Sequence, residues 1–416
     1  MEEDRFYVTA DLETGSRVMR SDYGQADRGY DLSSLRTLLR EGMQLNLLDC
    51  HIEGDTISPQ LIVIEPDFLV DISSLAACFT DYGHHAMAYT VNRLRPRANS
   101  QAILLGNFAG CALDGIINSA QRFSLNETVM ESFRNEALQF CTCPNFSPEV
   151  FMRDARQQAE NIREAVDVLF GSGEFDIAKA VVEPSFVCEQ LGLQGRADLM
   201  TTDFRLLVEQ KSGKAKWDNM RKTAAPGDGG NAKGAYTEAH YVQLLLYYGV
   251  LQHNFGFSHR HTDMRLLYSR YPAVNGLMAV SFYRTLFAEA IMLRNRIVAV
   301  EFAIARNGFG SITDLLSADV INERHLSGTF FNNYIRPQIE SVTAPLHSLS
   351  PLERSYFEHM MTFVYREQLA SRVGTVNSAA GSVADLWNMP LHEKIETGAI
   401  LFGEAPLASP QGGKTC

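Results

Sequence analysis

The chain has 416 residues, of which 45% are hydrophobic, enough for a sizeable buried core and about two or three domains. Its formal net charge is −12, which excludes a surface that is basic throughout, because contacts to nucleic-acid phosphates need Lys and Arg. No apolar run approaches the roughly 20 residues of a membrane-spanning helix, and the acidic start MEEDRFYVTADLETGSR carries no secretory signal. Seven irregularly spaced cysteines favour reduced thiols, so we expect a cytoplasmic protein without a membrane partner.

The N-terminal part of the chain predicts an arm followed by helices. Residues 1–35 are polar, with scattered Gly, Asp and Ser, and are expected to form a poorly ordered arm. Residues 34–48 carry leucines at helical spacing and predict an amphipathic helix. Residues 61–79, LIVIEPDFLVDISSLAACF, predict a β-branched strand that runs through a turn into a helix. Three further helices are expected, and they begin at Ala102, Ser124 and Ser147.

Three short apolar runs then predict a β-meander. They cover residues 178–188, 196–202 and 204–210, with turn residues between them. We expect each run to carry one acidic residue of interest, and these are Glu183 on the first strand, Asp198 near the start of the second and Glu209 at the end of the third.

These acidic residues are placed to meet. Neighbouring strands lie roughly 5 Å apart, so Asp198 and Glu209 are able to converge on one point. Lys211 follows Glu209 by two residues, and both side chains therefore point to the same face of the strand. A carboxylate cluster with a lysine beside it is typical of a site for a hard cation such as Mg²⁺. The alternative is a solvated strand end with a surface ion pair.

A long loop and a helix follow the predicted meander. Residues 215–236 are rich in Gly, Pro and Lys, and the loop they predict either closes over a phosphate backbone or is merely flexible. The helix from about Thr237 carries His240, Gln243 and Tyr247 on one face, an unusual polar stripe on an otherwise apolar helix.

The C-terminal part of the chain predicts one strand and then helices. The strand covers residues 264–271, and a long helix is expected over residues 281–306. Residues 311–375 predict mostly helical structure that is interrupted at three prolines, Pro337, Pro345 and Pro351. Two local basic tracks, residues 93–97 and 211–233, are the candidates for contact with nucleic acid.

Three motifs in this order resemble the signature of the PD-(D/E)XK nucleases, and in particular of their RecB-type branch. They are Gly195-x-x-Asp198, Glu209-x-Lys211 and Gln243-x-x-x-Tyr247. The resemblance covers about residues 65–270 and is to the nuclease domains of replication-type helicase–nucleases and of CRISPR-adaptation exonucleases.

The resemblance implies an α/β fold with a restriction-endonuclease-like core, in which helices flank a mixed central sheet, and a mostly helical C-terminal extension. We therefore predict four parts: a polar arm and helix over residues 1–55, the nuclease core over 56–275, the helical extension over 276–400 and a disordered tail over 401–416.

The implied reaction is Mg²⁺- or Mn²⁺-dependent hydrolysis of DNA phosphodiester bonds, on single-stranded ends or flaps, in DNA repair or replication. Asp198 and Glu209 would bind the metal, aided by Glu183. Lys211 would position the attacking water, and Gln243 and Tyr247 would hold the strand or orient Lys211. The implied partners are DNA and a helicase, as a separate protein or as a domain beyond this chain. The alternative is a module that holds DNA for a helicase without cutting it.

One departure from the family pattern lies in the helix that begins at Ala102. Relatives carry Gly-x-x-x-His-x-x-x-Glu there. In this chain Gly106 and Asp114 occupy the outer places, and Gly110 stands where the histidine would be. That histidine is a metal ligand in the relatives that have it, so the choice between one metal and two stays open.

Overall fold

The computed structural model describes residues 5–12, 15–22, 32–96, 99–119, 123–216, 236–256, 262–374 and 382–396. The chain divides into two compact units. The first consists of Met1–Arg95, Val187–Gln194 and Tyr283–Leu401, and the described residues of the second come from Pro96–Phe186 and Gly195–Phe282. The α/β fold class is confirmed, because sheets and helices are combined and the C-terminal region is mostly helical.

The second unit is built on a five-stranded mixed sheet with the order β14-β13-β12-β11-β8. Its strands are β8 (Ala180–Val182), β11 (Leu199–Thr201), β12 (Leu206–Lys211), β13 (Asp263–Tyr268) and β14 (Leu277–Val280). β12 and β13 are parallel and the other neighbours are antiparallel. β8, β11 and β12 form the predicted meander. Between β8 and β11 the chain makes an excursion through β9 (Ser185–Cys188) and β10 (Leu193–Arg196).

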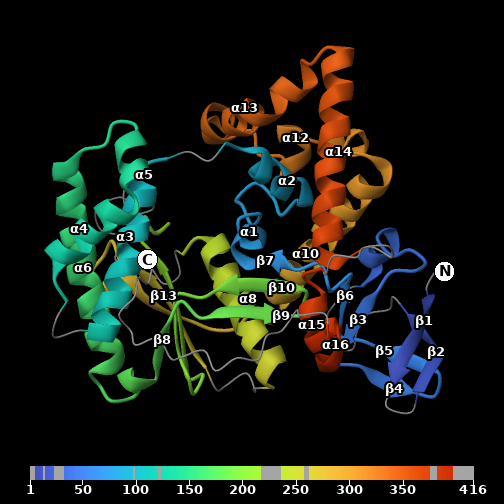
Figure 1. The fold of residues 1–416 in the computed structure, drawn as a ribbon, viewed down its shortest axis with the longest axis horizontal. Helices are drawn as coiled ribbons and strands as arrows, with labels where there is room; N and C mark the ends of the chain where they lie inside the picture. The colour runs from blue at the N-terminus through green and yellow to red at the C-terminus, as the bar shows by residue number, and fades with distance from the viewer. Residues whose placement is uncertain are drawn as a thin grey trace. The chain divides into compact units, whose positions relative to one another are not determined.

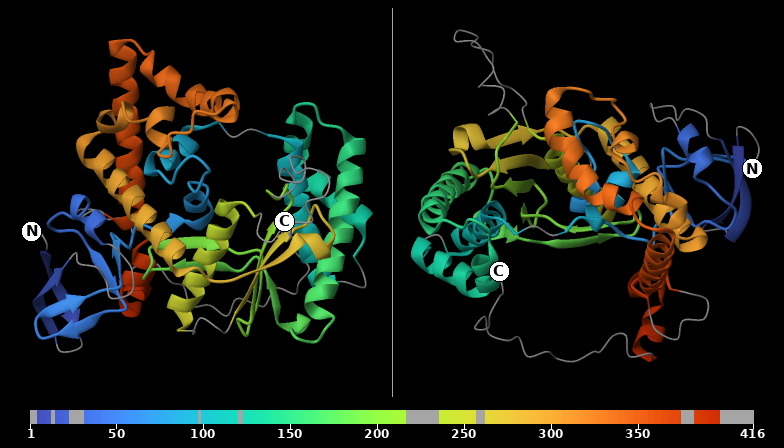
Figure 2. Two further views of the ribbon diagram at one scale, coloured as in Figure 1. Left: turned by 180° about the vertical axis from the view of Figure 1, so that it is seen from behind. Right: turned by 90° about the horizontal axis from the view of Figure 1, so that it is seen from above.

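Helices cover both faces of this sheet (Figures 1 and 2). The helical segments of the unit are α3 (Gln101–Ser119), α4 (Leu125–Asn135), α5 (Ala137–Thr142), α6 (Pro148–Phe170), η2 (Ile177–Lys179), α8 (Glu238–Phe255) and α9 (Ala273–Gly276). α4 and α6 begin where their capping sequences predicted, and α3 and α8 begin within one residue of their predicted starts. At α6, for example, the Ser147 hydroxyl accepts from the N–H of Val150. α3 and α6 lie on one face of the sheet, and α8 lies on the other.

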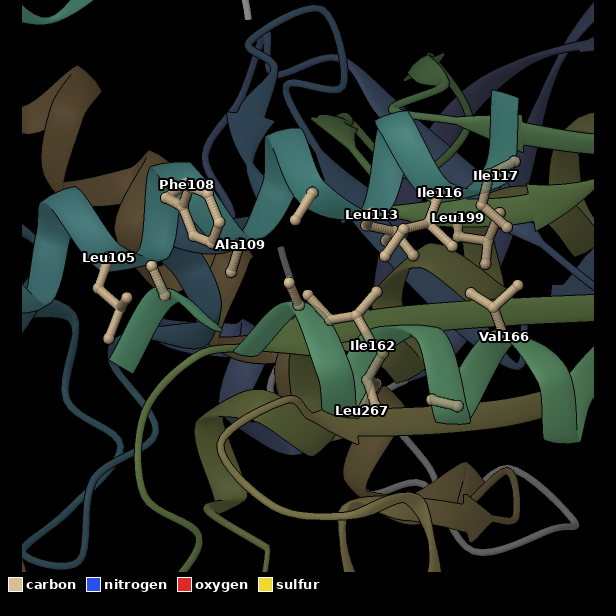
Figure 3. Close-up of a cluster of buried hydrophobic side chains, with 14 of the residues drawn as sticks. Leu105, Phe108, Ala109, Leu113, Ile116, Ile117, Ile162, Val166, Leu199 and Leu267 are labelled. Carbon is tan, nitrogen blue, oxygen red and sulfur yellow. The ribbon is translucent and has the colours of Figure 1, made fainter. Parts of the chain in front are cut away.

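The alternation of side chains along β12 follows from this layering. Leu206 and Val208 point into the hydrophobic cluster formed with α3 and α6, whereas Glu209 and Lys211 point toward α8. Figure 3 shows part of that cluster, which includes Leu105, Phe108, Leu113 and Ile116 of α3, Ile162 and Val166 of α6, Leu199 of β11 and Leu267 of β13. β11 and β12, which position Asp198 and Glu209, therefore pack on a close-packed apolar layer that holds them rigidly.

The first unit contains an N-terminal sheet where a disordered arm was predicted. β1 (Arg5–Leu12) and β2 (Gly15–Asp22) form an antiparallel hairpin, and the sheet continues through β5 (Thr56–Ser58) and β4 (His51–Glu53). The prediction over residues 1–35 was wrong for these strands because each buries only alternate residues. Phe6 and Met19 are buried, while Tyr7 and Val18 beside them are more than half exposed.

The prediction of a helix over residues 34–48 is also wrong. A short 3₁₀ helix, η1 (Ser33–Thr37), is followed by β3 (Leu45–Leu48), which pairs antiparallel with β6 (Leu61–Ile64). Gly42 has a φ of 80°, a left-handed conformation that interrupts any helix across this stretch. The leucines of β3 are held by strand pairing instead of by a helical face.

The rest of the first unit is mostly helical. Its remaining elements are β7 (Val70–Asp71), α1 (Ile72–Ala76), α2 (Ala86–Leu94), α10 (Arg284–Asn307), α11 (Gly310–Thr313), α12 (Ala318–Ile321), the π-helical turn η3 (Phe331–Ile335), α13 (Arg336–His347), α14 (Pro351–Val373), α15 (Asp385–Asn388) and α16 (Leu391–Glu396). α10 packs against α14 (Figure 1). Pro351 opens α14 as expected, but Pro345 lies inside the last turn of α13 and does not break it.

Some predicted features fall outside the described residues. They are most of the long loop after Lys216, the basic residues up to Lys233 and the tail predicted over 401–416. Among the helices that are described, none combines the length and the apolar character needed to cross a membrane.

Candidate active site

Two carboxyl groups meet at the centre of the second unit's sheet. Asp198 directly precedes β11, and Glu209 lies on β12, with only 2% of the residue exposed. Each carboxyl group is among the causes that shift the pKa of the other. Asp198 is fixed from the neighbouring strand, because its Oδ2 accepts from the backbone N–H of Gln210 at 2.6 Å. The structure thus brings together the two residues predicted to bind a metal.

Lys211 connects this pair to helix α8. Its Nζ donates to Glu209 Oε1 at 2.7 Å and to Gln243 Oε1 at 2.9 Å. The Lys211 side chain is 22% exposed, so it is partly accessible to solvent although these two bonds hold its ammonium group. Glu209, Lys211 and Gln243 therefore form one continuous array.

Tyr247 lies behind this array. The residue is fully buried, and its hydroxyl donates to the carbonyl oxygen of Arg196 at 2.6 Å and accepts from the Arg196 N–H at 3.1 Å. These two bonds fix the backbone immediately before Asp198. Tyr247 therefore positions the Gly195–Asp198 motif. Because the residue is fully buried, it has no exposed surface for contact with a bound strand.

Glu183 differs from its predicted place. It does not lie within a strand but in the break between β8 and β9, just before Pro184, with a left-handed φ of 54°. Its N–H donates to the carbonyl oxygen of Asp198 at 3.0 Å, so its backbone is next to the site. Its carboxylate, however, is half-exposed and pairs with Arg196 Nη1 at 3.0 Å. Sequence reasoning missed Arg196, although it is the residue between Gly195 and Ala197 in the first motif.

Burial shifts the proton affinity of the acidic pair. Burial first, and then the charge of Asp198, raise the pKa of Glu209 to about 8. Burial also raises the pKa of Asp198, although the Lys211 ammonium and the Gln210 N–H act in the opposite direction. When both buried acids are ionised, their two negative charges exceed the single positive charge of Lys211, and the site has an excess of negative charge.

The donor set of this pair fits a hard divalent cation. When Glu209 is ionised, its Oε2 is buried without a hydrogen-bond donor. Among the described residues, no three His, Cys, Asp or Glu side chains gather as a metal-binding group, so Glu183 does not complete a protein cage. Mg²⁺ commonly binds through one or two carboxylates and takes its other ligands from water and substrate phosphates. Asp198 and Glu209 match that arrangement.

The place of the missing histidine is open. α3 packs against the end of β12, where Gln210 Nε2 donates to the Ala109 carbonyl at 3.1 Å and a Cβ at Gly106 would lie 3.2 Å from Ser212 Oγ. A Cβ at Gly110 would meet no atom within 4 Å. Packing therefore does not require glycine at 110. Asp114, four residues on, accepts from Asn118 within the same helix.

In metal-free buffer, stability is expected to fall as the pH rises from about 5 to about 8. The folded protein keeps the Glu209 proton up to a pH of about 8, whereas the unfolded chain loses it near the ordinary value of 4.5. The folded state binds more protons across this window, so the free energy of unfolding declines with pH, by on the order of a few kcal/mol. Thermal melting in chelator at several pH values measures this.

A pair of variants isolates the residue responsible. Glu209→Gln should remove most of the decline, because the amide does not titrate. The half-exposed Glu183→Gln is the matched control and should keep it. An equal decline in wild type and in Glu209→Gln would assign the effect to other groups.

Comparisons with known proteins add little to this geometry. No protein-family model matches the chain, and no curated protein sequence matches it. Among solved structures, one match is a crystal structure from Eubacterium rectale named "putative exonuclease". It is 12% identical, with a TM-score of 0.33, and the match covers 64% of this chain and 93% of that one. A likeness of this size does not establish a shared fold.

Proposed function

We propose that the protein is a metal-dependent deoxyribonuclease of the PD-(D/E)XK type, in the RecB-type branch, with a restriction-endonuclease-like core. The observation that carries this proposal is the array of Asp198, Glu209, Lys211 and Gln243, which gathers the acids, the lysine and the helical glutamine of three sequence motifs in one place. A solvated strand end does not account for it, because Glu209 is almost fully buried.

Each residue of the array has a distinct task in phosphodiester hydrolysis. A Mg²⁺ or Mn²⁺ ion held by Asp198 and Glu209 would lower the pKa of a bound water and bind a phosphoryl oxygen. Lys211 places a positive charge beside these carboxylates and offsets the negative charge that develops on the phosphate in the transition state. Gln243 accepts from Lys211 Nζ and so limits the positions that the ammonium group can take.

DNA is the substrate proposed, at single-stranded ends or flaps. Lys214 and Lys216 follow β12 directly and are exposed, so positive charge continues along the chain from the array despite the net charge of −12. The preference for ends or flaps, the helicase partner and the place in DNA repair or replication rest on the motif resemblance.

A second candidate is a module that holds DNA for a helicase without cutting it. Two observations favour it: only two of the three predicted metal ligands converge, and the histidine of the family pattern is replaced by Gly110. Cleavage is favoured because the two motifs that contain Lys211 and Gln243 are complete.

Incubation of the purified chain with end-labelled single-stranded DNA and a flap duplex tests the proposal. We expect cleavage with Mn²⁺ or Mg²⁺ and none in excess chelator, because the site offers oxygen ligands. Undiminished cleavage in chelator would contradict metal dependence. DNA that is bound but never cut, with any of the metals, would favour the holding module.

A further inference from the structure

His240 lies beside the candidate active site but belongs to none of the three motifs. It stands one turn before Gln243 on α8, on the face that also carries Tyr247. Gln243 holds Lys211, so this face of α8 is turned toward the array. Tyr268, which the His240 ring contacts, lies opposite Lys211 on the neighbouring strand, and this brings His240 close to the array.

The orientation of the His240 ring is fixed by Tyr268. The Nδ1 atom lies 2.9 Å from the Tyr268 hydroxyl, and that tyrosine is fully buried on β13, directly opposite Lys211 in the strand ladder. The same hydroxyl accepts from the Thr237 N–H at 3.1 Å, so it is itself held at the start of α8. One ring nitrogen is thus committed to the protein interior.

The other ring nitrogen is not fully enclosed. In the part of the chain that the structure describes, Nε2 of His240 has no hydrogen-bond partner, and it is not among the enclosed polar atoms. Burial, and next the charge of Lys211, lower the pKa of His240 to about 4, so the ring is neutral near pH 7. A neutral imidazole whose Nδ1 accepts from a hydroxyl presents an N–H at Nε2. With this pKa, His240 is poorly suited to act as a general acid or base near neutral pH, because proton transfer is most efficient when the pKa lies near the working pH.

We propose that His240 is a further substrate-contacting residue, whose Nε2–H donates to a phosphate oxygen of the bound DNA strand next to the scissile bond. This inference rests on the proposed nuclease function. Side-chain donors to phosphate oxygens set the register of a strand without reading its sequence. At this position the donor would fix the strand relative to Lys211 and the two carboxylates.

The test combines binding and cleavage for the full chain. Binding of a fluorescein-labelled single-stranded oligonucleotide is measured by anisotropy in chelator, and cleavage is measured with Mn²⁺. His240→Ala should raise Kd and KM by about three- to tenfold, the size of one neutral hydrogen bond, with a smaller change in kcat. His240→Gln, whose amide places an N–H near the position of Nε2, should recover most of the loss.

Salt dependence separates this role from that of a cation. A neutral donor releases no counterion, so the slope of log Kd against log salt should be the same in wild type and in His240→Ala. Loss of a phosphate-bound lysine would lower that slope by about one. His359→Ala, which removes an exposed histidine on helix α14, is the control and should leave Kd unchanged.

The outcomes are distinguishable. Wild-type Kd and KM in a folded His240→Ala variant would overturn the proposal while cleavage by the wild type leaves the nuclease function intact. A loss that His240→Gln does not recover, together with a lower Tm, would reduce His240 to a packing role and also overturn it. If the wild type binds DNA but never cuts it, the nuclease function fails, and the Kd values still decide the role of His240. If the wild type does not bind DNA, both proposals are overturned.

Discussion

Lys211→Ala is expected to lower the rate of metal-dependent cleavage by about a hundredfold or more, while the protein remains folded. This is the scale seen when one preorganised charge is removed from a site where negative charge develops. Lys211 is held at 2.7 Å from Glu209 and 2.9 Å from Gln243, so its charge is in position before substrate arrives. No other lysine or arginine among the described residues donates to Glu209 or Asp198.

Single-turnover cleavage with Mn²⁺, together with thermal melting and Mn²⁺ titration, measures the effect. Lys179→Ala is the matched control, because that lysine lies next to β8 of the same sheet but pairs with Asp203 at 3.1 Å. Asp198→Ala should behave differently and weaken Mn²⁺ binding itself. A folded Lys211→Ala variant with nearly wild-type turnover would show that another group performs this task.

Arg294→Ala is expected to destabilise the first unit by about 3–5 kcal/mol, the range for removing one partner of a buried charged hydrogen-bond network. Arg294 lies on α10 and is fully buried. Its guanidinium donates to the main-chain carbonyls of Glu65 at 2.9 Å and Phe68 at 2.8 Å, and also to those of Ile64 and Gly192. Alanine would leave these carbonyls without a donor and open a cavity.

Fluorescence of Trp387 during urea unfolding reports this change. The Trp387 indole donates to Asp67 Oδ1 at 3.0 Å within the first unit, and Trp217→Phe removes the other tryptophan of the chain. Arg153→Ala, which removes an exposed arginine paired with its neighbour Asp154, should shift stability by no more than about 0.5 kcal/mol. A shift of similar size for both variants would contradict the role assigned to Arg294.

The centre of the candidate site was predictable because its determinants are local. Residues two apart on a strand share a face, and this placed Glu209 with Lys211; adjacent strands then placed Asp198 beside them. The helical spacing of Gln243 and Tyr247 was predictable for the same reason. Spacing and strand order therefore brought Asp198, Glu209 and Lys211 together, whereas the place of Gln243 beside Lys211 was implied by the motif resemblance.

The supporting contacts depend on pairings that the sequence does not encode locally. Tyr268 holds His240 only because β12 and β13 are parallel and in a register that sets Tyr268 opposite Lys211. The Arg196 side chain pairs with the Glu183 carboxylate, a contact between β10 and the break after β8. The prediction placed Glu183 on a strand, but β8 ends at Val182. Glu183 itself adopts a left-handed conformation just before Pro184, and the chain changes direction there.

The bonds that position Asp198 have a consequence for how the protein tolerates mutation. Asp198 is held by the peptide N–H of Gln210, and the segment before it is held by the peptide N–H and C=O of Arg196 through Tyr247. Main-chain groups are supplied by nearly every amino acid, so the identities of residues 196 and 210 are free to drift without loss of these bonds. Proline at either position is the exception, because it has no N–H to donate to Asp198 or to Tyr247.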